Sequence, residues 1–374
     1  MEDEGRATGG LDRARDPAPP RRRPWGRRAP YRPLQETTAA KTARGGATYA
    51  ALDLGTNNCR LLVARPTDDS FRVVDAFSRI IRLGEGMSTT GRISEAAIGR
   101  AVEALAICRD KMTNRAVSCE RLIATEACRT AENGADFRAR IAEEVGLELE
   151  IVDRETEATL AASGCTPLLD PQAEGAVLFD IGGGSSELVY LGPSCSTRQG
   201  PPPPDIRGWM SIPIGVVTLA ERHGGHAVTR EIYEAMTAEV AAFVSRFAVE
   251  HQIGALDGVH LLGTSGTVTT IAGVHLELKR YERRYIDGCW LTDEQVSCVI
   301  ERLLAMSYEE RVANPCIGAE RADLVLAGCA ILEAIRRAFP CKRVRVADRG
   351  LREGMLVQMM RADGVWDRAE EIPS

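Results

Sequence analysis

Two glycine-rich segments of the chain follow the same pattern. Residues 49–63 and 176–190 each contain an apolar run that ends in an aspartate, a turn of glycine and small polar residues, and a second apolar run. The aspartates are Asp53 and Asp180, and the segments align with each other without a gap. Apolar runs on both sides of such a turn are typical of a β-hairpin. The repeat predicts two similar α/β domains that face each other across a cleft.

The rest of the chain alternates between strands and helices. Period-two and continuous apolar runs predict strands at residues 48–54, 59–65, 71–80, 121–125, 147–152, 175–181, 186–192, 209–215, 258–263 and 344–348. Helical spacing of apolar residues predicts helices at residues 94–112, 134–146, 154–164, 228–251, 291–306, 321–339 and 349–360. Residues 194–208 contain four consecutive prolines, which favour an exposed, stiff hairpin loop.

The composition of the two turns predicts phosphate binding. Small residues let backbone N–H groups converge on an anion, and hydroxyl and amide side chains add hydrogen bonds. A third glycine-rich segment, residues 261–273, follows a strand and opens a helix, whose N-terminus also attracts anions. The residues expected to contact phosphate are Gly55, Thr56, Asn57, Asn58, Gly182, Gly183, Gly184, Ser185, Ser186, Gly266 and Thr267.

An aspartate that opens a phosphate-binding turn needs a cation beside it. Mg²⁺ prefers one or two carboxylates together with waters and phosphate oxygens. Asp53 and Asp180 therefore predict a Mg²⁺ site.

Charge is unevenly distributed along the chain. Residues 1–46 hold 11 basic and 6 acidic side chains, a net of +5, and since the whole chain is −6, the rest is −11. This N-terminal arm is rich in proline and poor in aliphatic residues, so we expect it to be disordered. An acidic folded part must bind a polyanion through local groups, because a broad basic field is absent.

The cysteines and the hydropathy indicate a cytoplasmic protein. None of the eleven cysteines is spaced as Cys-x-x-Cys, and most lie in apolar patterns, as do Cys108, Cys298 and Cys329. We expect reduced thiols in the core. No apolar run approaches the roughly 18 residues of a membrane span, and residues 1–10 lack the apolar part of a secretory signal. No membrane partner is expected.

The sequence resembles the exopolyphosphatase / guanosine pentaphosphate phosphohydrolase (Ppx/GppA) family of the actin/hexokinase superfamily. The resemblance rests on ALDLGTNNCRLLVARP, IATEACRTAENGADF, VDRETEATLAASG, FDIGGGSSELV, LLGTSGTVTTIAG and VADRGLREGML, which run in family order from about residue 48 to 361. It implies an α/β fold with two ribonuclease-H-like domains of the actin/hexokinase type around a central cleft. The expected domains are residues 47–164 and 165–374. None of the five histidines is followed by aspartate, unlike in the extra domain of longer members, so the short two-domain form is implied.

The resemblance also implies a reaction and the residues that perform it. The reaction is the Mg²⁺-dependent release of terminal orthophosphate from inorganic polyphosphate, or alternatively the removal of the 5′ γ-phosphate of guanosine pentaphosphate. Glu157 corresponds to the general base, and Asp180 and Glu187 to carboxylates linked to the metal. Arg129 is a candidate for binding phosphate oxygens, and Arg321 is a weaker one. A homodimer is expected, and no specific nucleic-acid partner.

The chain departs from the family pattern around two of these residues. Before Glu157, Asp153 and Arg154 replace Ser-Gly, and Thr156 replaces a glutamate. In the stretch A-T-S-A-x-R, Glu126 replaces serine, which leaves the role of that position open.

Two other functions are compatible with such a fold. A kinase of the superfamily would need an acceptor pocket, of which the sequence gives no sign. A non-catalytic sensor of guanosine alarmones would not need Glu157, Asp180 and Glu187, which are present.

Overall fold

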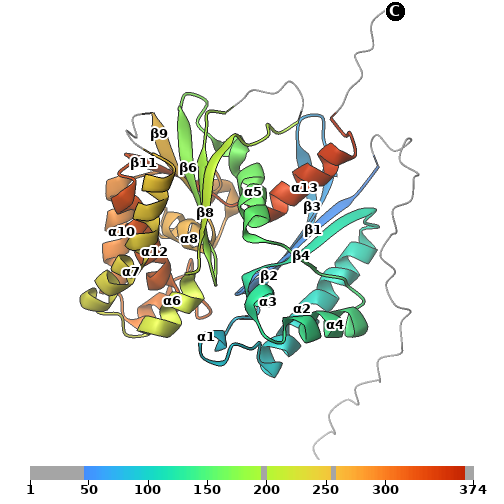
Figure 1. Cartoon of the computed structure of the whole chain (residues 1–374), viewed down its shortest axis with the longest axis horizontal. Helices are drawn as coiled ribbons and strands as arrows, with labels where there is room; N and C mark the ends of the chain where they lie inside the picture. The colour runs from blue at the N-terminus through green and yellow to red at the C-terminus, as the bar shows by residue number, and fades with distance from the viewer. Residues whose placement is uncertain (1–45, 195–199, 254–257, 367–374) are drawn as a thin grey trace, which may run out of the picture. The chain divides into compact units, whose positions relative to one another are not determined.

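The structure, a computed structural model, describes residues 46–194, 200–253 and 258–366 (Figure 1). The expected disorder of the N-terminal arm lies outside these residues, apart from Gly46. Within them, the chain forms two mixed β-sheets, each built around one of the repeated hairpins.

The first sheet has the strand order β3-β2-β1-β4-β5. Its strands are β1 (Tyr49–Leu54), β2 (Asn58–Pro66), β3 (Phe71–Ile80), β4 (Cys119–Ala124) and β5 (Glu150–Ile151). Strand β2 runs antiparallel to both β1 and β3, and β4 and β5 run parallel to β1. Helices α2 (Glu95–Asn114) and α4 (Gly134–Glu144) bury their apolar residues against one face. The side chain of Ser94 caps α2 by accepting a hydrogen bond from the N–H of Ala97.

The second sheet repeats this order and adds one strand, as β10-β11-β9-β6-β7-β8. Its strands are β6 (Gly175–Ile181), β7 (Ser186–Leu191), β8 (Ile206–Ile212), β9 (Val259–Thr264), β10 (Trp290–Thr292) and β11 (Arg343–Ala347). The helices that pack on one face are α6 (Val216–His223), α7 (Arg230–Glu250), α8 (Gly266–His275), α10 (Asp293–Ala305) and α12 (Val325–Ala338). The two matching strand orders confirm the predicted two-part α/β fold.

Helices α5 (Arg154–Cys165) and α13 (Leu351–Ala362) lie between the two sheets (Figure 1). Leu160 of α5 packs with β1 residues of the first sheet, whereas Ala158 and Ala162 pack with residues of β6 and β7. The two helices touch closely, because a Cβ at Gly354 would lie 2.0 Å from the carbonyl oxygen of Leu160. Thus α13, from the C-terminal part of the chain, packs on the first sheet. The expected domain boundary at residues 164 and 165 coincides with the end of α5 and stays a prediction.

Some elements differ from the sequence-based expectation. The strand expected at residues 209–215 is β8, which starts and ends three residues earlier, because Gly215 begins the turn into α6, a helix that was not predicted. The expected helix at residues 291–306 begins as the edge strand β10. Residues 147–152 contribute only the two-residue strand β5. The remaining short elements are α1 (Met87–Thr90), α3 (Glu126–Thr130), η1 (Thr166–Leu168), α9 (Arg283–Ile286) and α11 (Tyr308–Ala313).

The proline loop and one cysteine are also placed differently. Pro201 is buried and its carbonyl oxygen accepts a hydrogen bond from Arg361 at 2.5 Å, so this part of the loop is packed rather than exposed. Cys298 is exposed, because it points away from the core side of α10, whereas Cys108 and Cys329 are buried as expected. The cysteines in the described part of the chain have free thiols. Among the described helices, none has the length and apolar character needed to span a membrane.

Candidate functional site

The turns of the two repeated hairpins meet at the bottom of a cleft between the sheets. Thr56 of the first turn contacts Gly183 and Gly184 of the second. A Cβ at Gly184 would lie 2.9 Å from the Thr56 hydroxyl oxygen, and a Cβ at Gly183 would lie 3.0 Å from the Thr56 Cβ. Side chains at these glycines would therefore push the two hairpins apart.

Almost all of the predicted site residues come together in this cleft, which encloses about 960 Å³ of open space. The predicted residues that line it are Asp53, Gly55, Thr56, Asn57, Asn58, Glu157, Asp180, Gly182, Gly183, Gly184, Ser185, Glu187, Gly266, Thr267 and Arg321.

Ser186 and Arg129 are the two predicted phosphate ligands that do not line it. The Ser186 side chain is fully buried and donates its hydrogen bond to the carbonyl oxygen of Ile214 at 2.8 Å. It fixes the end of β8 and does not face the cleft. Arg129 directs its guanidinium to two carboxylates, those of Glu126 and Glu157.

The two hairpins have the same geometry but opposite charges at one position. In the first, Asp53 pairs across the strands with Arg60; in the second, Asp180 pairs with Glu187. Arg60 lines the cleft and was missed in the sequence analysis. The gapless alignment of the two repeats, which places Arg60 opposite Glu187, was the signal that could have found it.

Arg60 and Arg321 bring unpaired positive charge into the cleft. Neither guanidinium forms a hydrogen bond or ion pair with another residue in the described part of the chain, whereas most other arginines there are paired. Burial and the nearby charge of Arg60 lower the pKa of Arg321. Two cations without a protein partner are what an anionic ligand requires.

The described residues include two free carboxylates in the same cleft. Neither Asp53 nor Asp180 forms a side-chain hydrogen bond or ion pair with another described residue. Burial raises the pKa of Asp53, and burial together with the charge of Asp53 raises the pKa of Asp180 to about 6. The nearby charge of Arg60 lowers both pKa values but does not offset burial, so two carboxylates without a hydrogen-bonded partner remain costly to bury.

These groups fit a Mg²⁺ ion that also binds a phosphate. The described residues contain no group of three or more His, Cys, Asp and Glu side chains that would enclose a metal. Mg²⁺ does not need such a cage, because it keeps several waters and takes one or two carboxylates and substrate phosphates. The side-chain oxygens of Asn57 and Asn58 are buried and have no partner within the described residues, so they could accept hydrogen bonds from such waters.

Glu187 is held by the protein itself. Its Oε1 atom accepts hydrogen bonds from the hydroxyls of Ser185 at 2.8 Å and Ser211 at 2.9 Å. Burial and the charges of Glu157 and Asp180 raise its pKa well above the usual range. Asp53 and Asp180 are therefore better suited than Glu187 to bind a metal directly.

Glu157 lies on the first turn of α5, at the edge of the cleft. Asp153 caps this helix by accepting a hydrogen bond from the N–H of Thr156 at 2.8 Å. Glu157 is buried, whereas the neighbouring Glu155 is exposed. Burial raises the pKa of Glu157 to about 7, although the adjacent Arg129 acts in the opposite direction. A carboxyl group with this pKa can accept a proton near neutral pH.

The N-terminus of α8 forms another wall of the cleft. Ser265 has a φ of 115°, in the region that favours glycine, and its hydroxyl accepts a hydrogen bond from the N–H of Thr267. The unpaired N–H groups of this first turn, next to the Arg321 guanidinium, provide a further anion-binding element.

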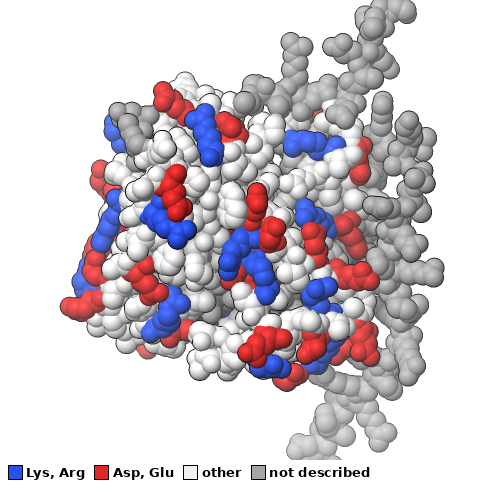
Figure 2. All heavy atoms as spheres, viewed as in Figure 1, with Lys and Arg blue, Asp and Glu red and all other residues white. Residues whose placement is uncertain are grey.

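Surface charge outside the cleft does not have a single sign. On the face shown in Figure 2, basic and acidic side chains lie next to each other in mixed clusters, and neither sign forms a continuous patch. Affinity for a polyanion must therefore come from the groups inside the cleft, as the net charge of the chain predicts.

Comparison with known proteins agrees with this geometry. Residues 62–363 match the model of the Ppx/GppA phosphatase family. A curated Haemophilus influenzae protein named "Putative exopolyphosphatase" is 24% identical over 312 residues, which cover 83% of this chain and 90% of that protein. The crystal structure of the Aquifex aeolicus Ppx/GppA family member has a TM-score of 0.70 and 27% identity, covering 85% and 98% of the two chains.

A Cytophaga hutchinsonii exopolyphosphatase structure shares the fold, with a TM-score of 0.74 and 24% identity over 85% of this chain and 99% of that one. The family match begins within β2 of the first hairpin, covers most of the chain, and includes the whole second hairpin, the Glu157 helix and the α8 loop. The chain therefore belongs to the Ppx/GppA phosphatase family.

Proposed function

We propose that this protein is a phosphoanhydride hydrolase that releases terminal orthophosphate from inorganic polyphosphate. The observation that carries the proposal is the position of Glu157, a buried carboxyl with a pKa of about 7, in the same cleft as two phosphate-type hairpins. Relatives named for exopolyphosphatase activity support polyphosphate as the substrate class.

The chain's own residues have distinct tasks in this reaction. Backbone N–H groups of the two turns and the N-terminus of α8 bind the oxygens of the terminal phosphate. Arg60 and Arg321 stabilise the negative charge on the transferred and leaving phosphates. Ionised Glu157 orients a water molecule and accepts its proton as the water oxygen attacks the terminal phosphorus. The P–O bond to the next phosphate then breaks, and orthophosphate and a polyphosphate one unit shorter are released.

Mg²⁺ is the cofactor that we propose for the site, held by Asp53 and Asp180. When bound, it neutralises charge on the phosphate oxygens. The support is the pair of unpartnered carboxylates in a cleft that also contains the anion-binding turns.

Phosphate release by the purified full-length chain tests the proposal. Polyphosphates of several lengths and guanosine pentaphosphate are compared side by side, each with Mg²⁺ and with excess chelator. We expect release from polyphosphate that depends on Mg²⁺. Release from guanosine pentaphosphate alone would replace the proposal with the second activity of the family, and no release from either would overturn it.

A further inference from the structure

Four charged side chains form a continuous chain at the edge of the cleft. Glu126 in α3 accepts hydrogen bonds on both carboxylate oxygens, from Arg129 on Oε2 and from Arg154 on Oε1, the latter at 2.9 Å. Arg129 directs its other terminal nitrogen, Nη1, to Glu157 Oε1 and to the carbonyl oxygen of Val152, both at 2.5 Å. The guanidinium of Arg129 is thus held between two carboxylates, and Arg154 holds the far one.

This chain of contacts is largely shielded from water. The side chains of Glu126, Arg129 and Glu157 are 12%, 19% and 6% exposed, whereas Arg154, at the outer end, is 41% exposed. Although burial works in the opposite direction, Arg154 and Arg129 lower the pKa of Glu126, so it is ionised. Glu126 also lines the cleft, and its Cγ atom is 3.0 Å from the point where a Cβ on Gly184 would lie.

We propose that Glu126 and Arg154 are positioning residues that act on Glu157 through Arg129. The inference rests on the proposed role of Glu157 as the base. Without Glu126, the Arg129 fork would keep a single carboxylate partner and could swing toward the phosphate. Without Arg154, the charge of Glu126 would be only partly neutralised next to a polyanionic substrate. With both present, Arg129 stays bound to Glu157 and fixes the direction of its carboxylate.

The charged groups that face Glu157 determine in which direction each variant should shift its pKa. Arg129 and Glu126 face it from α3, Asp53 from β1 and Glu187 from β7. The negative charge of Glu126 raises the pKa of Glu157. Glu126→Gln should therefore move the acid side of the pH–rate profile to lower pH. Arg154→Met removes the positive charge that partly neutralises Glu126, so Glu126 should act more strongly on Glu157. This variant should move the acid side of the profile to higher pH, but only while Glu126 is present.

The test is a double-mutant cycle of Glu126→Gln, Arg154→Met and the double variant, followed by kcat and KM against pH. We expect each single variant to lower kcat about tenfold with little change in KM, because the base is misdirected while substrate contacts remain. In the Glu126→Gln background, adding Arg154→Met should have no further effect. The exposed pair Arg92–Glu132 provides the control, and Glu132→Gln should change neither kcat nor the pH profile.

Two results would overturn the inference. One is that Arg154→Met shifts the pH–rate profile equally in the wild-type protein and in the Glu126→Gln variant. The other is that Glu126→Gln lowers KM and leaves kcat unchanged, which would place Glu126 in direct contact with substrate. The pKa of the Glu157 carboxyl can also be measured directly, by carbon-13 NMR titration of protein without substrate, with Glu157→Gln used to assign the signal. This pKa should fall in Glu126→Gln and rise in Arg154→Met. If the wild-type chain released no phosphate, the proposed function would fail, while the NMR shifts would still decide whether this chain of contacts controls Glu157.

Discussion

Glu155 and Glu157 lie in the same turn of α5 but in opposite surroundings. Residues two apart on an α-helix point about 200° away from each other. Glu157 accordingly enters the cleft, and Glu155 remains in solvent. Position in the helix, not residue type, decides which of the two carboxylates can meet a substrate.

Glu157→Gln should lower kcat by about 10²- to 10⁴-fold, or roughly 3–5 kcal/mol, because it removes the proton acceptor and keeps the shape of the side chain. Binding of polyphosphate should persist, since the proposed phosphate contacts, the two turns and Arg60, remain in the cleft. Steady-state phosphate release and direct binding measurements check both parts. Glu155→Gln is the matched control and should cost little. The reverse result would identify Glu155 as the base.

The pH dependence of kcat follows from the raised pKa of Glu157. A base must be ionised, so kcat should fall about tenfold per pH unit once the pH drops below about 7. Arg129→Gln removes a positive charge that lowers this pKa, so the decline should begin at a higher pH. A pH–rate profile of both proteins tests this. A decline that begins at lower pH in the variant would contradict the assignment.

For single residues, the sequence was most informative where the chain repeats itself. The glycines, the two aspartates and the small polar residues of both turns were predicted from the pattern and do line the cleft, with Ser186 as the exception. The partners of Arg129 could not be predicted, because Glu157 is distant in sequence and approaches it only when α5 docks against α3. In the structure its guanidinium contacts two carboxylates, and its expected phosphate contact stays a prediction.

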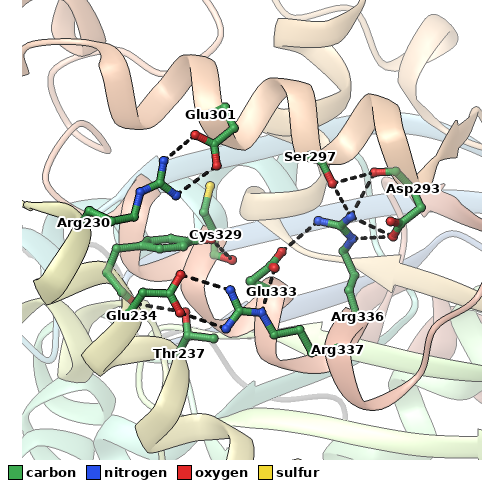
Figure 3. Close-up of polar contacts among 11 residues, drawn as sticks. Arg230, Glu234, Thr237, Asp293, Ser297, Glu301, Cys329, Glu333, Arg336 and Arg337 are labelled. Atoms are coloured by element: carbon green, nitrogen blue, oxygen red, sulfur yellow. Dashed lines mark hydrogen bonds and ion pairs between the residues drawn. The ribbon is translucent and has the colours of Figure 1, made fainter.

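At the level of elements, three helices of the second half are joined by a polar network (Figure 3). Arg336 of α12 is 7% exposed and binds Asp293 and Ser297 of α10 and Glu333 of its own helix. Arg230 of α7 forms a more exposed pair with Glu301 of α10. These contacts hold together the helices that pack beside α8, which forms one wall of the cleft. None of their side chains enters the cleft.

Arg336→Met should lower the free energy of unfolding by about 1–3 kcal/mol, because it removes a buried charged donor from three partly exposed acceptors. Arg230→Met removes a separate ion pair between α7 and α10 whose side chains are half exposed, and should cost less than about 1 kcal/mol. Urea unfolding of both variants measures the difference. Equal losses would mean that burial does not control the strength of these pairs.

Strands and long helices were predictable from periodicity, but their ends were not. The apolar pattern at residues 209–215 continues past β8, and only the close approach of Gly215 to the Gly183 turn fixes where the strand stops and α6 starts. Leu291 begins an expected helix by pattern, yet pairing with β11 makes it a strand residue. In both cases, tertiary contacts override local preference.

At the level of the whole molecule, the proposed metal ligands come from different sheets. Asp53 is the second-last residue of β1 in the first sheet, and Asp180 is the second-last residue of β6 in the second. Asp180→Asn should raise the Mg²⁺ concentration needed for half-maximal activity by more than Glu187→Gln does, because Glu187 already accepts two hydroxyl hydrogen bonds. Phosphate release against Mg²⁺ concentration measures this. Full activity of the wild-type chain in excess chelator would refute the metal assignment.

The sequence predicted the cleft between two similar halves, but not what holds the halves together. Residues far apart in sequence make these contacts, and no local pattern marks them. Glu221 of α6 accepts hydrogen bonds from the N–H of Gly86 and the hydroxyl of Ser88, two residues in the segment that follows strand β3 of the first sheet. Arg82, next to them, donates two hydrogen bonds to Asp323 at 2.9 and 3.0 Å.

Asp323→Asn should weaken this bridge and let the cleft open. The substrate would then have to close it, so KM should rise about fivefold, as expected for the loss of about 1 kcal/mol, while kcat changes little. Small-angle X-ray scattering without substrate should show a larger radius of gyration. Glu277→Gln, which removes the exposed pair between Arg302 and Glu277, is the control and should leave KM unchanged. If Asp323→Asn altered neither KM nor the radius of gyration, the packing of α5 and α13 alone would be enough to hold the halves together, and the Arg82 bridge would have no role in substrate binding.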